Sequence, residues 1–168
     1  MAKDNLDSAR KQLDLTLGFF PRVDTKLSIV LGIDLGMLGL LLSKVPDDLS
    51  KLPSWVWIAA SFFGAAMILS LFSLYFGSFP NVNGGNKSLV FFRTIAKKQA
   101  NLFVREYQAL TEESLTEDLL HQAWRNSVIL DKKFSHLKSA YIATVLSLIP
   151  WSINLFEFIR AASLVKHG

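Results

Sequence analysis

Three long apolar segments constrain this chain more than any other feature of its sequence. Residues 27–43 contain a single charge, and residues 55–79 and 140–156 contain none. Their lengths lie near the roughly 17 to 25 residues that a helix needs to cross a hydrocarbon layer about 30 Å thick. The helices of a soluble bundle are usually amphipathic over such a length. The sequence therefore predicts an all-α integral membrane protein with three transmembrane helices.

Lysine and arginine are distributed unevenly among the segments that flank these spans. Five precede the first span, whereas the turn between the first two spans carries Lys44 and Lys51, offset by Asp47 and Asp48. Nine more lie between residues 87 and 138. Because positive charge favours the cytoplasmic side, we expect a cytoplasmic N-terminus, a short outer turn and a large cytoplasmic segment before the third span. The positive charges of the tail leave a half-crossing or interfacial third segment as an alternative.

We expect five regions along the chain. They are an N-terminal amphipathic cytoplasmic segment (1–26), a hairpin of two transmembrane spans (27–79), a cytoplasmic helical module (80–138), a third span (139–160) and a tail (161–168). Apolar spacing in the module predicts an amphipathic helix over about 87–110, capped by Asn86 or Ser88. The S-x-x-E spacing of Ser114 and Glu117 predicts a capping box. No breaker follows before Pro150, so a helix from about 115 should continue into the third span.

Motifs of enzymatic chemistry are not found in the sequence. It has no Gly-rich phosphate loop, no nucleophile elbow and no dinucleotide-binding fingerprint. His121, His136 and His167 are isolated, and the chain has no cysteine. No catalytic residue and no metal site are therefore predicted, and binding, assembly or permeation is favoured over catalysis.

Asp34 is a carboxylic acid near the middle of the first span. At about 100° per residue it lies about 200° around the helix from Gly32, and so points away from a small-residue face suited to contacts in a homo-oligomer. That face consists of Gly32, Gly36 and Gly39. The partners available to Asp34 at this depth are water, hydroxyls and amides, namely Ser61, Ser70, Thr144, Ser147 and Asn154. Either Asp34 is protonated and hydrogen-bonded between helices, or it faces water in an oligomeric pore and favours cations.

Several stretches of the chain occur in an order and at spacings that resemble a known family. They are "VDTKLSIVLGIDLGML", "LVFFRTIAKKQANLFVREY", "DLLHQ" and "ILDKKFSHLKSAY". Over roughly residues 20–158 they are similar to the transmembrane effector of the bacterial Pycsar antiphage systems (PycTM). The resemblance is strongest in Asp24-Thr25-Lys26 and in the series Asp118, Gln122, Lys133 and Ala140.

The resemblance implies a specific function. A pyrimidine nucleotide cyclase, activated by phage infection, makes a cyclic pyrimidine mononucleotide, cUMP or cCMP. The effector responds by impairing the bacterial inner membrane, which causes growth arrest or cell death. The partners expected on this basis are this ligand, membrane lipid and further copies of the chain, with no other cofactor and no nucleic acid.

Residues suited to such a ligand lie in the cytoplasmic module and at the start of the first span. A cyclic mononucleotide requires a cation for its phosphate, an amide or carboxylate for its polar groups and an aromatic or apolar wall. The candidate binding residues are Arg22, Asp24, Lys26, Arg93, Lys97, Asp118, Gln122, Arg125 and Lys133, with Phe103, Tyr107 and Trp124 as possible walls.

Each group of candidates has a structural alternative. Arg93 and Lys97 could form a solvated or headgroup-facing basic surface, and Asp118 with Gln122 could simply pair helices. Residues 22–26 could anchor a helix at the headgroups.

Two other functions remain open. One is a constitutive oligomeric membrane channel or scaffold without nucleotide sensing. The other is an amphipathic membrane toxin that acts through an N-terminal stripe of Leu6, Leu13, Leu17 and Phe20.

Overall fold

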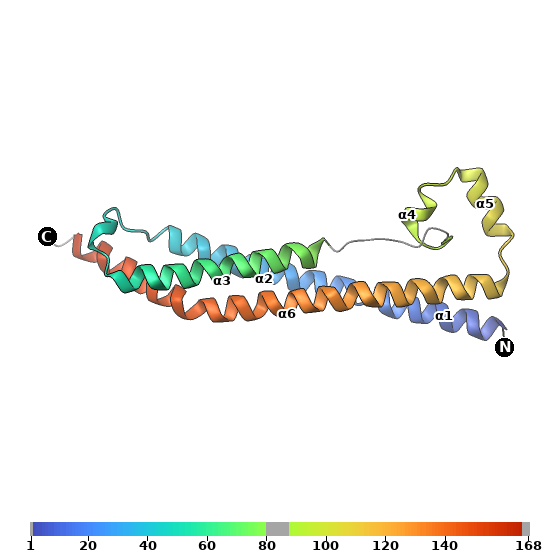
Figure 1. Cartoon of the computed structure of the whole chain (residues 1–168), viewed down its shortest axis with the longest axis horizontal. Helices are drawn as coiled ribbons and strands as arrows, with labels where there is room; N and C mark the ends of the chain where they lie inside the picture. The colour runs from blue at the N-terminus through green and yellow to red at the C-terminus, as the bar shows by residue number, and fades with distance from the viewer. Residues whose placement is uncertain (1, 80–87, 166–168) are drawn as a thin grey trace. The chain divides into compact units, whose positions relative to one another are not determined.

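The structure is a computed structural model that describes residues 2–79 and 88–165, and each α-helical or 3-10 segment within them can be followed in Figure 1. In chain order the elements are α1 (Ala2–Leu17), α2 (Phe20–Leu42), the 3-10 turn η1 (Leu49–Lys51), α3 (Ser54–Ser78), α4 (Phe92–Ile95), α5 (Ala100–Gln108) and α6 (Glu112–Val165). No strand occurs among these residues, and the predicted all-α class is confirmed.

Within residues 2–79 and 88–165, three helical stretches are long and apolar enough to cross a membrane. They are Asp4–Leu42, Ser54–Ser78 and Glu112–Ser163. The prediction of three apolar spanning helices, the last of them long and continuous, is confirmed. The first spanning helix begins earlier than the apolar pattern suggests. Its α2 part starts at Phe20 and carries Pro21 in its first turn. Proline suits that position, since a first-turn N–H has no partner within the helix.

The chain divides into two compact units. Unit 1 consists of Met1–Val23 and Pro80–Lys133, and unit 2 consists of Asp24–Phe79 and Phe134–Gly168. Both α2 and α6 contribute residues to each unit.

In unit 2, residues of α2, α3 and the later part of α6 pack side by side (Figure 1). The core consists of Met37, Leu41, Leu52, Val56, Phe63, Met67 and Phe158. Gly77 permits a close approach of the three helices, because a Cβ there would lie 3.1 Å from Leu27 Cδ2 and 3.2 Å from His136 Cβ. A larger residue at position 77 would have to push its neighbours apart.

Helix α6 continues through Pro150. Proline has no N–H, and its ring disturbs the preceding helical turn. Polar side chains bond the backbone around this turn: Ser147 Oγ donates to Thr144 O at 2.7 Å, and Asn154 Nδ2 donates to Pro150 O at 2.9 Å. Trp151 Nε1 also donates to Met37 O at 2.9 Å, which joins α6 to α2. Such bonds make a proline tolerable inside a membrane span.

In unit 1, α1 packs against the first turns of α6. Its core is formed by Leu6, Ala9 and Leu13 with Leu119 and Ala123. The spacing of the α1 residues places them on one face of the helix. Leu6 and Leu13, proposed from the sequence as part of a membrane-active stripe, are thus buried against protein.

The predicted helix over 87–110 is wrong in its described part. Two short helices take its place, because α4 ends at Ile95 and α5 begins at Ala100. Gln99 has an extended backbone, with φ −70° and ψ 142°, and is the N-cap residue of α5, so the helix cannot continue through it. A side-chain bond from Lys98 to Glu106 spans the turn. The predicted cap Asn86 lies outside the described residues.

The predicted capping box at Ser114 and Glu117 is also wrong. Helix α6 begins at Glu112, one turn earlier than expected. Thr111 Oγ1 accepts the Ser114 N–H at 3.2 Å, and Thr111 O accepts the Leu115 N–H at 3.0 Å. Thr111 is therefore the N-cap residue.

Candidate functional site

Asp34 forms the centre of a buried polar cluster in unit 2. Ser70 Oγ donates to Asp34 Oδ2 at 2.6 Å, and Thr144 Oγ1 donates to Asp34 Oδ1 at 2.8 Å. The two hydroxyl oxygens lie 3.1 Å apart. These residues come from α3, α6 and α2, so the cluster, which we call the Asp34 node, joins all three helices of unit 2. A carboxyl group at this depth in a membrane requires such partners.

The Asp34 side chain has 0% of its surface exposed. On other faces of α2, a Cβ added at Gly32, Gly36 or Gly39 would meet no atom within 4 Å. The structure thus places Asp34 inside one chain and leaves the glycine face open. The hydrogen bonds between helices agree with the first interpretation of Asp34; the protonation that this interpretation includes stays a prediction.

Further polar side chains are buried along the later part of α6. Ser147 and Asn154 are fully buried, but they bond the backbone of α6 and not Asp34. Asn154 Oδ1 has no hydrogen-bond partner among the described residues. Glu157, which sequence analysis did not single out, is also buried, and its Oε1 lies 3.6 Å from Arg160 Nη1.

Unit 1 contains a pocket of about 700 Å³, large enough for a small-molecule ligand. Its walls come from the first turns of α6, from Ser88 and Leu89, and from Leu110. Three predicted ligand residues line it together: Asp118, Gln122 and Arg125. They follow one another at i, i+4 and i+7, and so share one face of α6.

Two sets of hydrogen bonds hold the segment opposite α6 in this pocket. Asp118 Oδ2 accepts the Leu89 N–H at 2.8 Å. Ser88 Oγ accepts the N–H groups of Val90 and Phe91 at 3.1 and 2.9 Å. A carboxylate that accepts a backbone N–H makes one of the stronger hydrogen bonds in proteins. Asp118 therefore has a structural role, but it holds the non-helical segment at Leu89 and does not pair helices as the alternative interpretation expected.

The remaining lining groups supply varied chemistry. Trp124 is 67% exposed and offers an indole face, whereas Gln122 is 4% exposed and contributes an amide side chain to the lining. Among the described lining residues, Arg125 supplies a permanent positive charge. His121 Nε2 lies 3.7 Å from Glu117 Oε1 on the exposed side. The lining residues thus offer a guanidinium, an amide and an indole face beside the carboxylates of Glu117 and Asp118.

The other predicted ligand residues lie elsewhere. Arg93 and Lys97 are exposed and do not line this pocket, and Lys133 is buried at 4% exposure. The guanidinium carbon of Arg22 lies 5.3 Å from the centre of the Phe19 ring. Asp24 is exposed, with its carbonyl accepting from Ser28 Oγ at 3.0 Å.

Lys26 lines a separate groove in unit 2. Of the proposed aromatic walls, Phe103 and Tyr107 pack on each other with ring centres 5.7 Å apart. Within residues 2–79 and 88–165, no group of three His, Cys, Asp or Glu residues is placed to hold a metal ion.

Comparison with known proteins gives one match. The model of the Pycsar effector protein domain matches residues 8–157. No curated protein and no solved structure matches the chain. The matched range includes the Asp34 node and every residue that lines the pocket of unit 1.

Proposed function

Because the chain belongs to the Pycsar effector family, and so to the membrane effectors of antiphage defence, we propose that unit 1 senses a cyclic pyrimidine mononucleotide. The ligand is cUMP or cCMP, made by a partner pyrimidine nucleotide cyclase. Its binding leads unit 2 to impair the bacterial inner membrane, which stops growth or kills the cell. The observation that carries the proposal is the convergence of Asp118, Gln122 and Arg125 on one pocket.

The pocket suits each part of such a ligand. Arg125 would bind the cyclic phosphate, because a guanidinium can donate two parallel hydrogen bonds to phosphate oxygens. Trp124 would stack on the pyrimidine ring. The Gln122 amide can both donate and accept, so it serves uracil or cytosine equally. Asp118 Oδ1 would accept from the ribose hydroxyl while Oδ2 keeps its bond to the Leu89 N–H.

Gating requires that the ligand bind the active state more tightly than the resting state. The Asp118 bond to Leu89 is the contact in the pocket that a nucleotide bound at Asp118 Oδ1 would most directly strengthen. Helix α6 provides the mechanical link, because it runs unbroken from Glu112 past Thr144.

We also propose that the protein acts as a homo-oligomer with its N-terminus in the cytoplasm. One chain supplies three spanning helices, which are too few to enclose a pore of their own. The open face at Gly32, Gly36 and Gly39 allows close contact with a helix of another copy.

Ligand binding can be measured on the purified full chain in detergent by calorimetry with cUMP, cCMP and cAMP. We expect one of the two pyrimidine nucleotides to bind, and Arg125→Gln to weaken its binding by about tenfold or more, since hydrogen bonds to charged groups contribute about 1.5 to 3 kcal/mol. Arg105→Gln is the matched control, because Arg105 is exposed and lies outside the pocket.

Two results would reject the proposal. If neither pyrimidine nucleotide binds, nucleotide sensing is excluded and a constitutive channel or scaffold is favoured. If Arg125→Gln and Arg105→Gln bind the nucleotide equally well, the ligand site lies outside the pocket of unit 1.

A further inference from the structure

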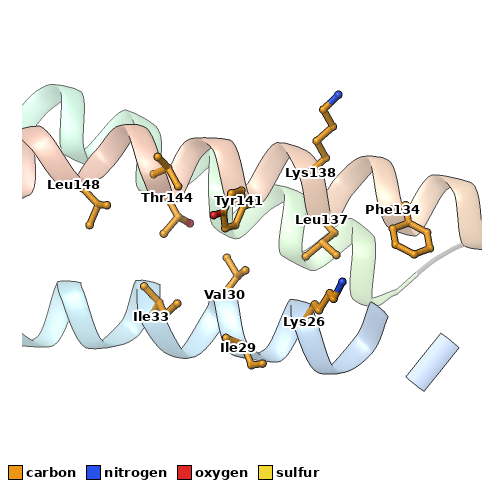
Figure 2. A pocket seen from close by; sticks show the side chains of 11 residues that line it. Lys26, Ile29, Val30, Ile33, Phe134, Leu137, Lys138, Tyr141, Thr144 and Leu148 are labelled. Carbon is orange, nitrogen blue, oxygen red and sulfur yellow. The ribbon is translucent and has the colours of Figure 1, made fainter. Parts of the chain in front are cut away.

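A groove of about 540 Å³ lies between α2 and α6 in unit 2, apart from the pocket of unit 1 (Figure 2). Its long walls are apolar and include Ile29 and Ile33 of α2 and Val145 and Leu148 of α6. All four of these side chains are exposed in the single chain. In a membrane-spanning unit, such a groove faces hydrocarbon.

Among the described residues that line this groove, charge occurs at one end. These charged residues are Lys26 and Lys138, and no acidic residue in the described part of the chain lines the groove. In Figure 2, Lys26 extends from α2 toward α6 beside Leu137, whereas Lys138 leaves α6 on the side away from α2. Both lysines are exposed, and neither forms an ion pair with another residue in 2–79 or 88–165.

The length of the groove matches one half of a bilayer. Lys138 and Leu148 are ten residues apart on α6, which corresponds to about 15 Å at 1.5 Å per residue. One leaflet contributes about half of a hydrocarbon thickness of about 30 Å. A positive end and an apolar channel of this length match a phospholipid, with its phosphate at Lys26 and an acyl chain between the helices.

We propose that the groove between α2 and α6 is a binding site for one anionic phospholipid. Lys26 binds the headgroup phosphate, and Lys138 supplies a second positive charge at the rim. The acyl chain packs against Ile33 and Val145 on opposite walls. A zwitterionic lipid would fill the apolar part equally well but would gain less from the two lysines.

The site also adjoins the Asp34 node. Thr144 lines the groove, and its Oγ1 donates to Asp34 Oδ1 at 2.8 Å. A bound acyl chain therefore packs against a residue that holds α2 and α6 together. Lipid occupancy should stabilise this packing, whatever ligand unit 1 binds.

The proposal can be tested by native mass spectrometry of the full chain, released from detergent after incubation with phosphatidylglycerol or phosphatidylcholine of identical acyl chains. We expect one phosphatidylglycerol to be retained per chain in preference to phosphatidylcholine. The double variant Lys26→Gln/Lys138→Gln should weaken retention by about 30-fold, from about fivefold for each lysine near an anionic headgroup. Lys11→Gln/Lys97→Gln removes the same charge outside the groove and should have no such effect.

A second pair of variants tests the apolar wall. Ile33→Trp fills the groove and should abolish specific retention. The control Ile68→Trp places the same ring on α3, at a position that is 71% exposed and lines neither this groove nor the pocket between α3 and α6. Thermal unfolding confirms that both variants are folded.

Equal retention of the two lipids by the unaltered chain would overturn the proposal. So would retention by the double lysine variant that equals that of its control. If Ile33→Trp changes the number of chains per particle and leaves phosphatidylglycerol retention unchanged, a second copy occupies the groove and the lipid proposal is wrong.

Discussion

Replacing Ser70 by alanine removes one of the two hydroxyl donors to Asp34. Ser70 is fully buried, and its Oγ lies 2.6 Å from Asp34 Oδ2. Alanine keeps the Cβ and introduces no new atom, so the change leaves the packing of α2, α3 and α6 intact. Asp34 Oδ2 then loses the hydroxyl that donates to it inside a water-poor core, and this loss should lower the free energy of unfolding.

The expected magnitude follows from the geometry of the node. Hydrogen bonds between membrane helices contribute about 0.6 kcal/mol on average and at most about 1.7 kcal/mol, whereas bonds to charged groups in soluble proteins reach about 1.5 to 3 kcal/mol. Because the Ser70–Asp34 hydrogen bond is short and completely buried, its contribution should lie at the upper end of the range for membrane helices. We expect Ser70→Ala to cost about 1.5 kcal/mol.

Thr144→Val should cost a similar amount, because it removes the donor to Asp34 Oδ1 while preserving side-chain shape. Both hydroxyls act on one carboxyl group, so the double variant should depart from additivity by about 0.5 kcal/mol or more.

Reversible unfolding in mixed micelles, with increasing sodium dodecyl sulfate and detection by circular dichroism, measures these differences. Ser73→Ala is the matched control: Ser73 is 5% exposed and lies three residues further along α3, but does not bond Asp34. An equal loss of stability in Ser70→Ala and Ser73→Ala would refute the reasoning. Asp34→Asn keeps a carbonyl acceptor and should preserve assembly; a change in ion selectivity in that variant would instead place Asp34 in a pore.

Three further predictions concern helix packing and capping. Gly77→Ala should destabilise unit 2 by about 1 kcal/mol, because overpacking costs about 1 to 3 kcal/mol and outweighs a gain in helix propensity of about 0.5 to 1 kcal/mol. The control Gly64→Ala adds a Cβ that meets no atom within 4 Å, so it should not destabilise unit 2 in the same unfolding assay. Thr111→Ala should cost about 1 kcal/mol at the start of α6, seen as faster amide hydrogen exchange in its first turn. Trp151→Phe removes the donor to Met37 O and should lower stability by about 0.6 kcal/mol in the same titration.

The spanning helices were predictable because each depends on a property of a continuous segment. Length and apolar composition identify them, and the turn of about 100° per residue places Asp34 opposite the glycine face. The choice of Ser70 and Thr144 among five possible partners was not predictable. It depends on how far α3 and α6 are shifted along α2, and no local pattern specifies that shift.

The segment between the second and third spans was predicted less well, for a related reason. The apolar repeat continues from Ala96 through Ala100 to Phe103, yet the backbone is extended at Gln99 and the chain breaks there into α4 and α5. The candidate residues Asp118, Gln122 and Arg125 share a helix face, which the sequence shows directly. The bond from Leu89 N–H to Asp118 could not be foreseen, because it joins an irregular segment to a helix 29 residues away.

Ligand-gated leakage through a membrane tests the central claim most directly. The full chain is reconstituted into liposomes that contain a self-quenched dye, and cUMP or cCMP is added on the side that unit 1 faces. We predict that release of the dye begins on addition of the matching nucleotide and that Arg125→Gln shifts the response to concentrations about tenfold or more higher. Release that is the same with and without either nucleotide would contradict the account.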